Sequence, residues 1–204
     1  MIYPKQIFRN KANNFTYGII VLLTMTYCIS EAVIIFWGPT FLRAERFFNL
    51  QNTGLALSVF WLSVIGGRLI ISIFTDKVDN FKIMFFISII GFFSVLFFTI
   101  LSDKYLIFIF ITLAGLSYSG IFPLLVSSGS EIFDRGKGLI LTIIFTASSI
   151  GKAVTPYLID ITSGVSMFLS IFLAVIFMAL TVFLLAILLF FHKKTFNTEK
   201  KYNY

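Results

Sequence analysis

Residues 59–77 read VFWLSVIGGRLIISIFTDK and residues 147–164 read ASSIGKAVTPYLIDITSG, and these two stretches decide the fold. Both are mainly apolar, and both place one basic residue, Arg68 or Lys152, directly after a glycine and eight residues before an aspartate. A helix that crosses a membrane needs about 20 consecutive apolar residues. The two stretches therefore predict membrane-spanning helices that carry a charged residue within the span.

The composition of the whole chain agrees with insertion into a membrane. Of the 204 residues, 58% are hydrophobic and 12% are charged, whereas a soluble domain is about half apolar and about a quarter charged. A soluble globule, a disordered chain and a coiled coil are therefore excluded. Strands of a membrane barrel are only about ten residues long, so the longer apolar runs also exclude a barrel. The runs predict six helices, at 15–42, 50–75, 83–102, 105–130, 138–160 and 164–191.

The positions of lysine and arginine predict how these helices are oriented. With six spans both termini lie on one side, and eleven of the sixteen basic residues fall on that side. Arg43, Arg46 and Lys104 fall on the other side, and two more lie within the spans. Cytoplasmic loops carry the excess of basic residues in membrane proteins. We therefore expect both termini to be cytoplasmic, in a multi-pass protein of the inner or plasma membrane.

The first half of the chain matches the second at an offset of 84 residues. The matched pairs are Pro39 with Pro123, Gly54 with Gly138, Gly67 with Gly151, Arg68 with Lys152, and Asp76 with Asp160. Three helices separate the copies, so the second copy crosses the membrane in the opposite direction, as in many secondary transporters. The expected fold is an all-α membrane protein with two inverted three-helix repeats, at 15–102 and 103–191, between cytoplasmic tails at 1–14 and 192–204.

Four stretches resemble the carboxy-terminal half of the major facilitator superfamily. They are YCISEAVIIFWGPTFL at 27–42, which resembles fucose-permease-like members, VFWLSVIGGRLIISIFTDK at 59–77, LAGLSYSGIFPLL at 113–125, and ASSIGKAVTPYLIDITSG at 147–164. The loop after the second stretch departs from the family's Gly-x-x-x-Asp-Arg/Lys-x-Gly-Arg signature, because only Asp76 and Lys77 match its core. The resemblance implies half of a facilitator fold and transport of a small solute by alternating access.

The length of the chain departs from that family. A facilitator needs about twelve helices, because its substrate site lies between two six-helix halves. The resemblance therefore implies a half-length chain or fragment of a secondary transporter. A second six-helix half or a second copy would complete it, and its other partners would be the lipid bilayer, a small-molecule substrate and, as a candidate coupling ion, a proton. The alternative is a non-transporting membrane scaffold or an eroded transporter remnant.

Charges inside the spans are the first candidates for function. Each costs at least about 2.5–3.5 kcal/mol at the centre of a membrane helix, so it needs a reason to be there. Glu31 lies eleven residues before Leu42, and Lys152 lies eight residues before Asp160, so both are about 12–16 Å below the outer ends of their helices. These helices are neighbours in the facilitator fold. We therefore expect a Glu31–Lys152 ion pair, either a packing salt bridge or a pair that opens when a proton or substrate arrives.

Arg68 lies closer to the cytoplasmic end of its helix, eight residues before Asp76. We expect it to belong to a cytoplasmic gating network, and the alternatives are a substrate contact and an arginine that simply extends to the membrane interface. The network comprises Arg68, Asp76, Lys77, Glu131 and Arg135.

Uncharged residues within the spans supply further candidates. Tyr27, Tyr118 and Ser119 are candidates for substrate binding or coupling. Small residues allow membrane helices to approach closely. Close helix contacts are therefore expected at Gly66, Gly67, Gly115, Gly120 and Gly151.

No enzyme activity is expected. An intramembrane serine protease needs a Gly-x-Ser-Gly motif and a histidine at the depth of the serine, but Ser119 lacks the first glycine. His192, the only histidine, belongs to the cytoplasmic end of the last helix, roughly 16 Å from the depth of Ser119, too far for a general base. With one cysteine and one histidine, and without a phosphate-binding glycine loop, no catalytic residue, metal, cofactor or nucleic acid is expected.

Overall fold

The computed structural model describes residues 14–75, 77–132 and 137–202, and all the regular structure in these ranges is helical. In chain order the elements are α1 (Asn14–Ala32), η2 (Val33–Trp37), α2 (Gly38–Ala44), α3 (Leu50–Phe74), α4 (Asn80–Ile100), α5 (Lys104–Ile132), α6 (Lys137–Ser163) and α7 (Met167–Tyr202). The element η2 is a short π-helical segment between two α-helices.

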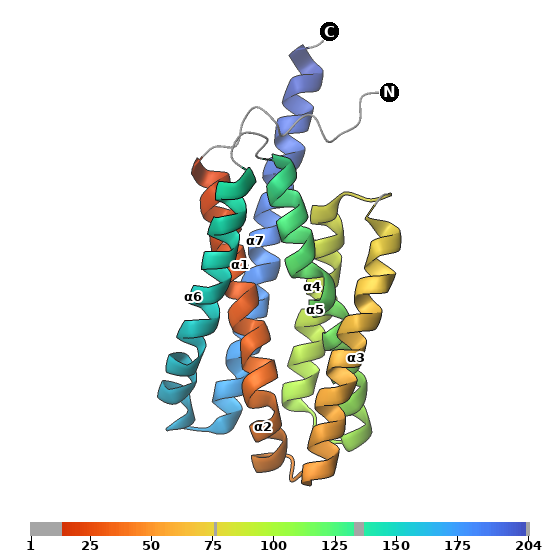
Figure 1. Cartoon of the computed structure of the whole chain (residues 1–204), viewed down its shortest axis with the longest axis vertical. Helices are drawn as coiled ribbons and strands as arrows, with labels where there is room; N and C mark the ends of the chain where they lie inside the picture. Colours follow the sequence, from red (N-terminus) through yellow and green to blue (C-terminus); the bar gives the residue numbers. More distant parts are fainter. Residues whose placement is uncertain (1–13, 76, 133–136, 203–204) are drawn as a thin grey trace.

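Six helical stretches within the described ranges are long and apolar enough to cross a membrane. The first, Thr16–Ala44, runs through α1, η2 and α2, and the other five lie within α3 to α7. Figure 1 shows that α1 begins and α7 ends at the same end of the bundle, as an even number of spans requires. The predicted fold class, an all-α membrane protein with six spans, is therefore confirmed.

Polar residues in the short connections determine where two of the helices begin. Asn49 precedes α3, and its side chain accepts a hydrogen bond at 2.8 Å from a backbone N–H of the first turn. Asp79 precedes α4 and accepts one in the same way at 2.9 Å. Such caps satisfy backbone donors that have no partner within the helix. The cap places the start of α4 at Asn80, before the charged Lys82, so the expected start at residue 83 is wrong.

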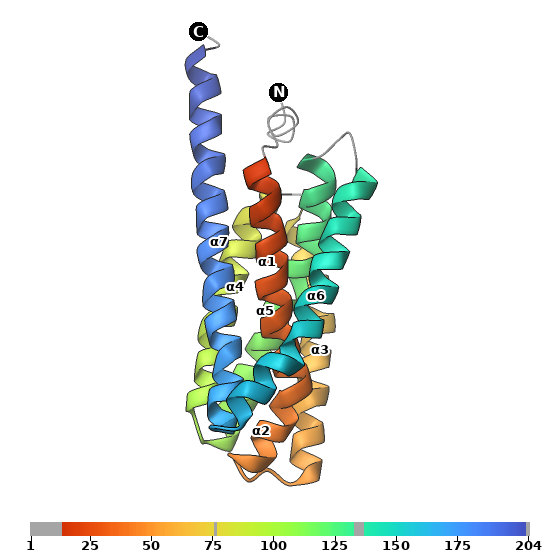
Figure 2. The same cartoon turned by 90° about the vertical axis from the view of Figure 1, so that its left-hand side faces the viewer.

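The main contacts between helices have the symmetry of a two-unit repeat. Helix α1 packs against α6 and α7, α5 packs against α3 and α4, and α4 packs against α7. Exchanging the first span with the fourth, the second with the fifth and the third with the sixth gives the same set of pairs. Figure 2 shows the resulting layers, with α4 and α7 on one side of α1 and α5, and α3 and α6 on the other. The contacts agree with an inverted repeat, and its exact boundaries stay a prediction.

Two glycines that the repeat relates lie at equivalent helix crossings. A Cβ atom on Gly67 would lie 2.9 Å from the Leu116 carbonyl oxygen of α5, and one on Gly151 would lie 3.0 Å from the Met25 carbonyl oxygen of α1. Side chains at either position would push the helices apart. Close contacts are also confirmed for two further glycines, Gly115 and Gly120.

Gly66, the neighbour of Gly67, differs from the other four glycines. A Cβ atom there would have nothing within 4 Å, so the expectation of a close contact at Gly66 is wrong. Successive residues of an α-helix point about 100° apart, and α3 therefore turns only one glycine of the pair toward α5.

Candidate functional site

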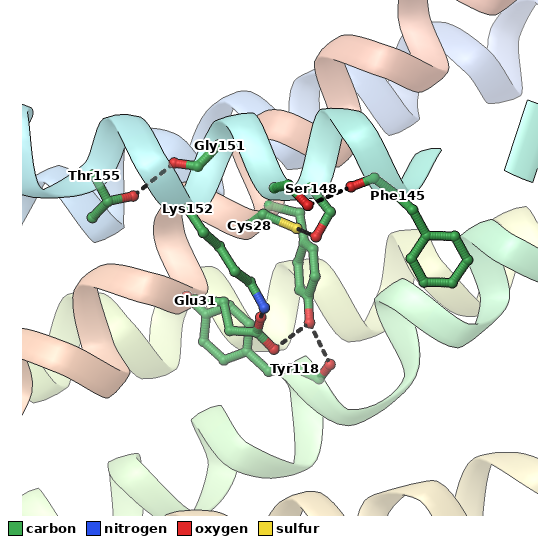
Figure 3. A network of polar contacts seen from close by, with 10 residues as sticks. Cys28, Glu31, Tyr118, Phe145, Ser148, Gly151, Lys152 and Thr155 are labelled. Atoms are coloured by element: carbon green, nitrogen blue, oxygen red, sulfur yellow. Dashed lines mark hydrogen bonds and ion pairs between the residues drawn. The ribbon is translucent and has the colours of Figure 1, made fainter. Parts of the chain in front are cut away.

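Glu31 on α1 and Lys152 on α6 form an ion pair within the membrane-spanning part of the bundle. The Lys152 Nζ atom lies 3.2 Å from the Glu31 Oε2 atom, and Figure 3 shows the lysine side chain extending from α6 to the carboxylate. The Glu31 side chain is 19% exposed and the Lys152 side chain is 46% exposed, so the pair lies at the edge of the packed bundle. This contact is the one that the depths of the two residues predict.

Helices α1 and α6 approach closely beside the ion pair. Gly151, the residue before Lys152, packs against the backbone of Met25. Next to this contact the buried Cys28 Sγ donates a hydrogen bond to the Ser148 Oγ at 3.2 Å, as Figure 3 shows. The close approach keeps the lysine within reach of the carboxylate.

A chain of hydrogen bonds leads from Glu31 into the centre of the bundle. The Tyr27 hydroxyl lies 2.7 Å from Glu31 Oε1 and 3.0 Å from the backbone carbonyl oxygen of Tyr118 on α5. The Tyr118 hydroxyl lies 2.5 Å from Ser30 Oγ, which donates to the Ala174 carbonyl oxygen of α7 at 2.7 Å. Both tyrosines are buried. These contacts therefore link the charged pair with α5 and, through the side chain of Tyr118 and Ser30, with α7.

The third uncharged candidate lies apart from this network. Ser119 is buried where α5 meets α3, next to Gly67, and its hydroxyl donates to the Leu116 carbonyl oxygen of its own helix. No hydrogen bond joins it to Glu31 or Lys152 among the described contacts. Its role in binding or coupling stays a prediction.

Part of the expected gating network lies outside the described residues. Arg68 and Lys77 are both exposed. Asp76 and Arg135 are not described, and for Glu131 only the backbone is described. The network therefore stays a prediction.

Helices α3 and α6 expose a face with polar positions, here named the open face. In the apolar centre of each span only 22% of the α3 residues and 33% of the α6 residues are buried, the lowest shares of the six spans. The exposed polar residues recur at helical spacing, with Gln51, Ser58, Arg68 and Ser72 on α3 and Thr142, Thr146, Ser149, Lys152 and Asp160 on α6. Polar residues on a membrane helix face protein or water rather than lipid. This chain leaves that face uncovered.

Sequence reasoning missed Ser30, Cys28 and Ser148. A signal for Ser30 is present in the sequence, because Tyr27, Ser30 and Glu31 are spaced three and four residues apart and so share one face of a helix. The contact between Cys28 and Ser148 depends on how α1 and α6 are rotated about their axes, which depth along the membrane does not reveal.

Comparison with known proteins gives consistent matches. A sequence profile of the Major Facilitator Superfamily matches residues 5–202, nearly the whole chain. The "Protein TsgA homolog" of Buchnera aphidicola subsp. Baizongia pistaciae (strain Bp) is 22% identical over 147 residues, which is 72% of this chain and 38% of that protein. The "Glucose/mannose transporter GlcP" of Bacillus subtilis (strain 168) is 27% identical over 111 residues, which is 54% of this chain and 28% of that protein. The matched segments thus cover well under half the length of either relative.

Proposed function

The chain belongs to the Major Facilitator Superfamily, and on that premise we propose that it is one six-helix half of a secondary transporter that moves a small solute by alternating access. The proposal rests on one observation above all, the Glu31–Lys152 pair beside an uncovered polar face. Ionisable residues within membrane spans are costly, and they typically mark the paths of substrates or ions. The chain contacts the bilayer through its apolar surface and the solute through this pair.

The half is the carboxy-terminal one, and its two termini are cytoplasmic in the plasma membrane. The first statement is supported by the four stretches that resemble that half. The second is supported by the eleven basic residues on the side of the termini against three on the other side. Helix α1 begins and helix α7 ends at the same end of the bundle, which agrees with termini on one side of the membrane.

A second six-helix half covers the open face. Exposed polar and charged side chains on α3 and α6, Arg68 and Lys152 among them, would otherwise meet lipid, where charged groups are costly. The parts of the two relatives that match this chain amount to 38% and 28% of their lengths, so those proteins contain further sequence of the size that a second half needs. A second copy of this chain is the other occupant that a test must distinguish.

Glu31 and Lys152 are the coupling pair, and a proton is the coupling ion. The pairing of a carboxylate that is 19% exposed with a lysine inside the spans supports this role, because ionisable residues there typically mark ion paths. Tyr27 and Tyr118 support the pair, and Ser119 contributes to the solute path from α5. Arg68, Asp76, Lys77, Glu131 and Arg135 form the cytoplasmic gate of the same cycle.

Hexoses are the first solutes to test, because one relative is described as a glucose/mannose transporter. Since the substrate of this chain need not be a hexose, the decisive assay is untargeted. Vesicles containing the purified protein, with the half that copurifies, are incubated with a mixture of small metabolites under a proton gradient. Mass spectrometry of the lumen then identifies solutes that accumulate relative to empty vesicles.

The expected result is accumulation of at least one solute that is lost in Glu31→Gln. Lys104→Met is the control, because it removes an exposed charge that belongs neither to the pair nor to the cytoplasmic gate. The competing function is a non-transporting scaffold or remnant, which the short match to the relatives favours. It would be supported by a stable, correctly inserted protein that accumulates no solute above empty vesicles.

A further inference from the structure

The Tyr27 hydroxyl group has more acceptors than it can use. It lies 2.7 Å from the Glu31 Oε1 atom and 3.0 Å from the Tyr118 carbonyl oxygen, and both oxygens can accept its hydrogen bond. A phenol has one O–H proton, so it donates to one of them at a time. Hydrogen bonds to an ionised group are the stronger ones. With Glu31 ionised, the proton is therefore directed to the carboxylate.

The neighbouring hydrogen bonds have a fixed direction. A backbone carbonyl only accepts, so Ser30 donates its proton to Ala174. The Ser30 oxygen must then accept from the Tyr118 hydroxyl, which lies 2.5 Å away. Among the hydroxyl groups of these described hydrogen bonds, that of Tyr27 is therefore the one whose acceptor depends on whether Glu31 is ionised.

The groups that surround Glu31 limit what its protonation changes. Among the described residues, the titratable or charged groups around it are Tyr27 and Cys28 on α1, Tyr118 on α5 and Lys152 on α6. Helix α7 contributes the carbonyl oxygen of Ala174 to the same network. Lys152 provides the opposing charge to Glu31, and it is bound to the other carboxylate oxygen, Oε2. The Oε1 atom is thus the side of the carboxylate that faces Tyr27.

We propose that Tyr27 is a positioning residue whose single O–H group changes its hydrogen-bond acceptor. It donates to Glu31 while that residue is ionised, and to the Tyr118 carbonyl oxygen when Glu31 is protonated. This inference rests on the proposed role of Glu31 as the proton carrier. In the step, a proton from the solute path adds to the carboxylate and forms a neutral carboxyl group. The new carboxyl O–H donates to the Tyr27 oxygen, and the Tyr27 O–H rotates to the carbonyl. No covalent bond other than this O–H bond forms, and Lys152 keeps its charge but loses its counter-ion.

The exchange links protonation to helix contacts. It replaces an ion pair between α1 and α6 by a hydrogen bond between α1 and α5. The new bond reaches the turn of α5 that precedes Pro123, a residue that lies inside the helix and has no N–H to donate. In a helix that N–H would donate to the carbonyl of Ser119, so the altered contact at Tyr118 lies one residue from the missing hydrogen bond of α5. At the same time Lys152, which is 46% exposed, becomes free to turn toward the open face.

Infrared difference spectroscopy between neutral and acid pH tests the exchange on the full chain, purified with any copurifying half in lipid nanodiscs. The band of a protonated carboxyl group is assigned to Glu31 by its loss in Glu31→Gln. In Tyr27→Phe the band should shift to higher frequency, because the carboxyl O–H has lost its acceptor. Tyr118→Phe is the matched control, since it removes an equally buried hydroxyl that does not contact the carboxylate, and its band should stay in place.

A second measurement needs no substitution at Tyr27. The C–O stretching band of tyrosine in the parent protein should change on acidification, as the Tyr27 oxygen becomes an acceptor as well as a donor, and the change should be absent in Glu31→Gln. A Glu31 band that keeps its position in Tyr27→Phe, or a tyrosine band that does not change, would overturn the exchange and leave Glu31 as a proton site. Absence of any Glu31 band at acid pH would overturn the proton role itself, and the exchange with it.

Discussion

Removing either member of the Glu31–Lys152 pair should destabilise the bundle, and removing both should restore most of the loss. On insertion scales an unpaired charge at the centre of a membrane helix costs about 2.5–3.5 kcal/mol, and this partly exposed pair at the edge of the bundle should stay below that limit. The limit is not reached in Glu31→Gln, because the stranded Lys152 is 46% exposed on a long flexible stem. We expect that change to cost about 1–2 kcal/mol, between the values of exposed and of buried pairs.

Lys152→Met should cost more than Glu31→Gln. It strands a carboxylate that is only 19% exposed and that has a short stem. A loss of about 2–3 kcal/mol is therefore expected, and the double variant should lie within about 1 kcal/mol of the parent, because apolar or neutral replacements of both partners are often tolerated. These values give a coupling energy of roughly 2–5 kcal/mol, at or above the upper end of the usual range for residues in contact.

The chain contains its own reporter for this experiment. Cys28 is the only cysteine and is buried, so a thiol-reactive dye labels it only when the protein unfolds. Thermal unfolding of the four proteins in one detergent gives the double-mutant cycle, and Lys104→Met provides the control for loss of an exposed charge. Single variants that unfold at the temperature of the parent would show that the pair does not form. A double variant no more stable than the worse single variant would refute the reasoning from stranded charges.

The remaining predictions concern topology and packing. A reporter fused after Tyr204 should be cytoplasmic and one in the loop at 43–49 external, because eleven basic residues lie on the side of the termini against three on the other, and the reverse result would contradict the orientation. Gly67→Ala should cost about 1–3 kcal/mol, because its Cβ would lie 2.9 Å from a carbonyl oxygen of α5. Gly66→Ala should be neutral or slightly stabilising, because its Cβ would have nothing within 4 Å, so equal unfolding temperatures of the two variants would disprove the helix crossing.

The six spans were predictable because the membrane imposes one dominant constraint. Backbone groups in lipid need partners within their own segment, so long uncharged runs become helices and hydropathy locates them. The ends of the spans are less well determined. Lys82 lies in the first turn of α4, capped by Asp79, although a rule based on charge places it outside the membrane. The π-helical segment η2 was not predicted, because it leaves no trace in hydropathy.

The sequence predicts how deep the site residues lie in the membrane, but not the side of the helix on which each side chain lies. Counting residues from the helix ends brings Glu31 and Lys152 to similar depths, and the structure pairs them. Tyr118 and Ser119 show the limit, since the two are adjacent in sequence and lie at nearly one depth. The side chain of Tyr118 joins the network of Ser30, whereas that of Ser119 packs against α3. Which way a residue points depends on the rotation of each helix about its axis, and interhelical packing decides that rotation.

The measurement that tests the central claim most directly is photocrosslinking in the native membrane. A photoreactive amino acid is placed at Ser149 on the open face, and at Phe183, which is 61% exposed on the opposite layer, as the control. If the chain is one half of a transporter, Ser149 should crosslink to a second six-helix half, and Phe183 should crosslink mainly to lipid. A Ser149 crosslink between two copies of this chain would assign the second half to a homodimer instead. Crosslinks from Ser149 to lipid alone would contradict the claim that a second half covers this face.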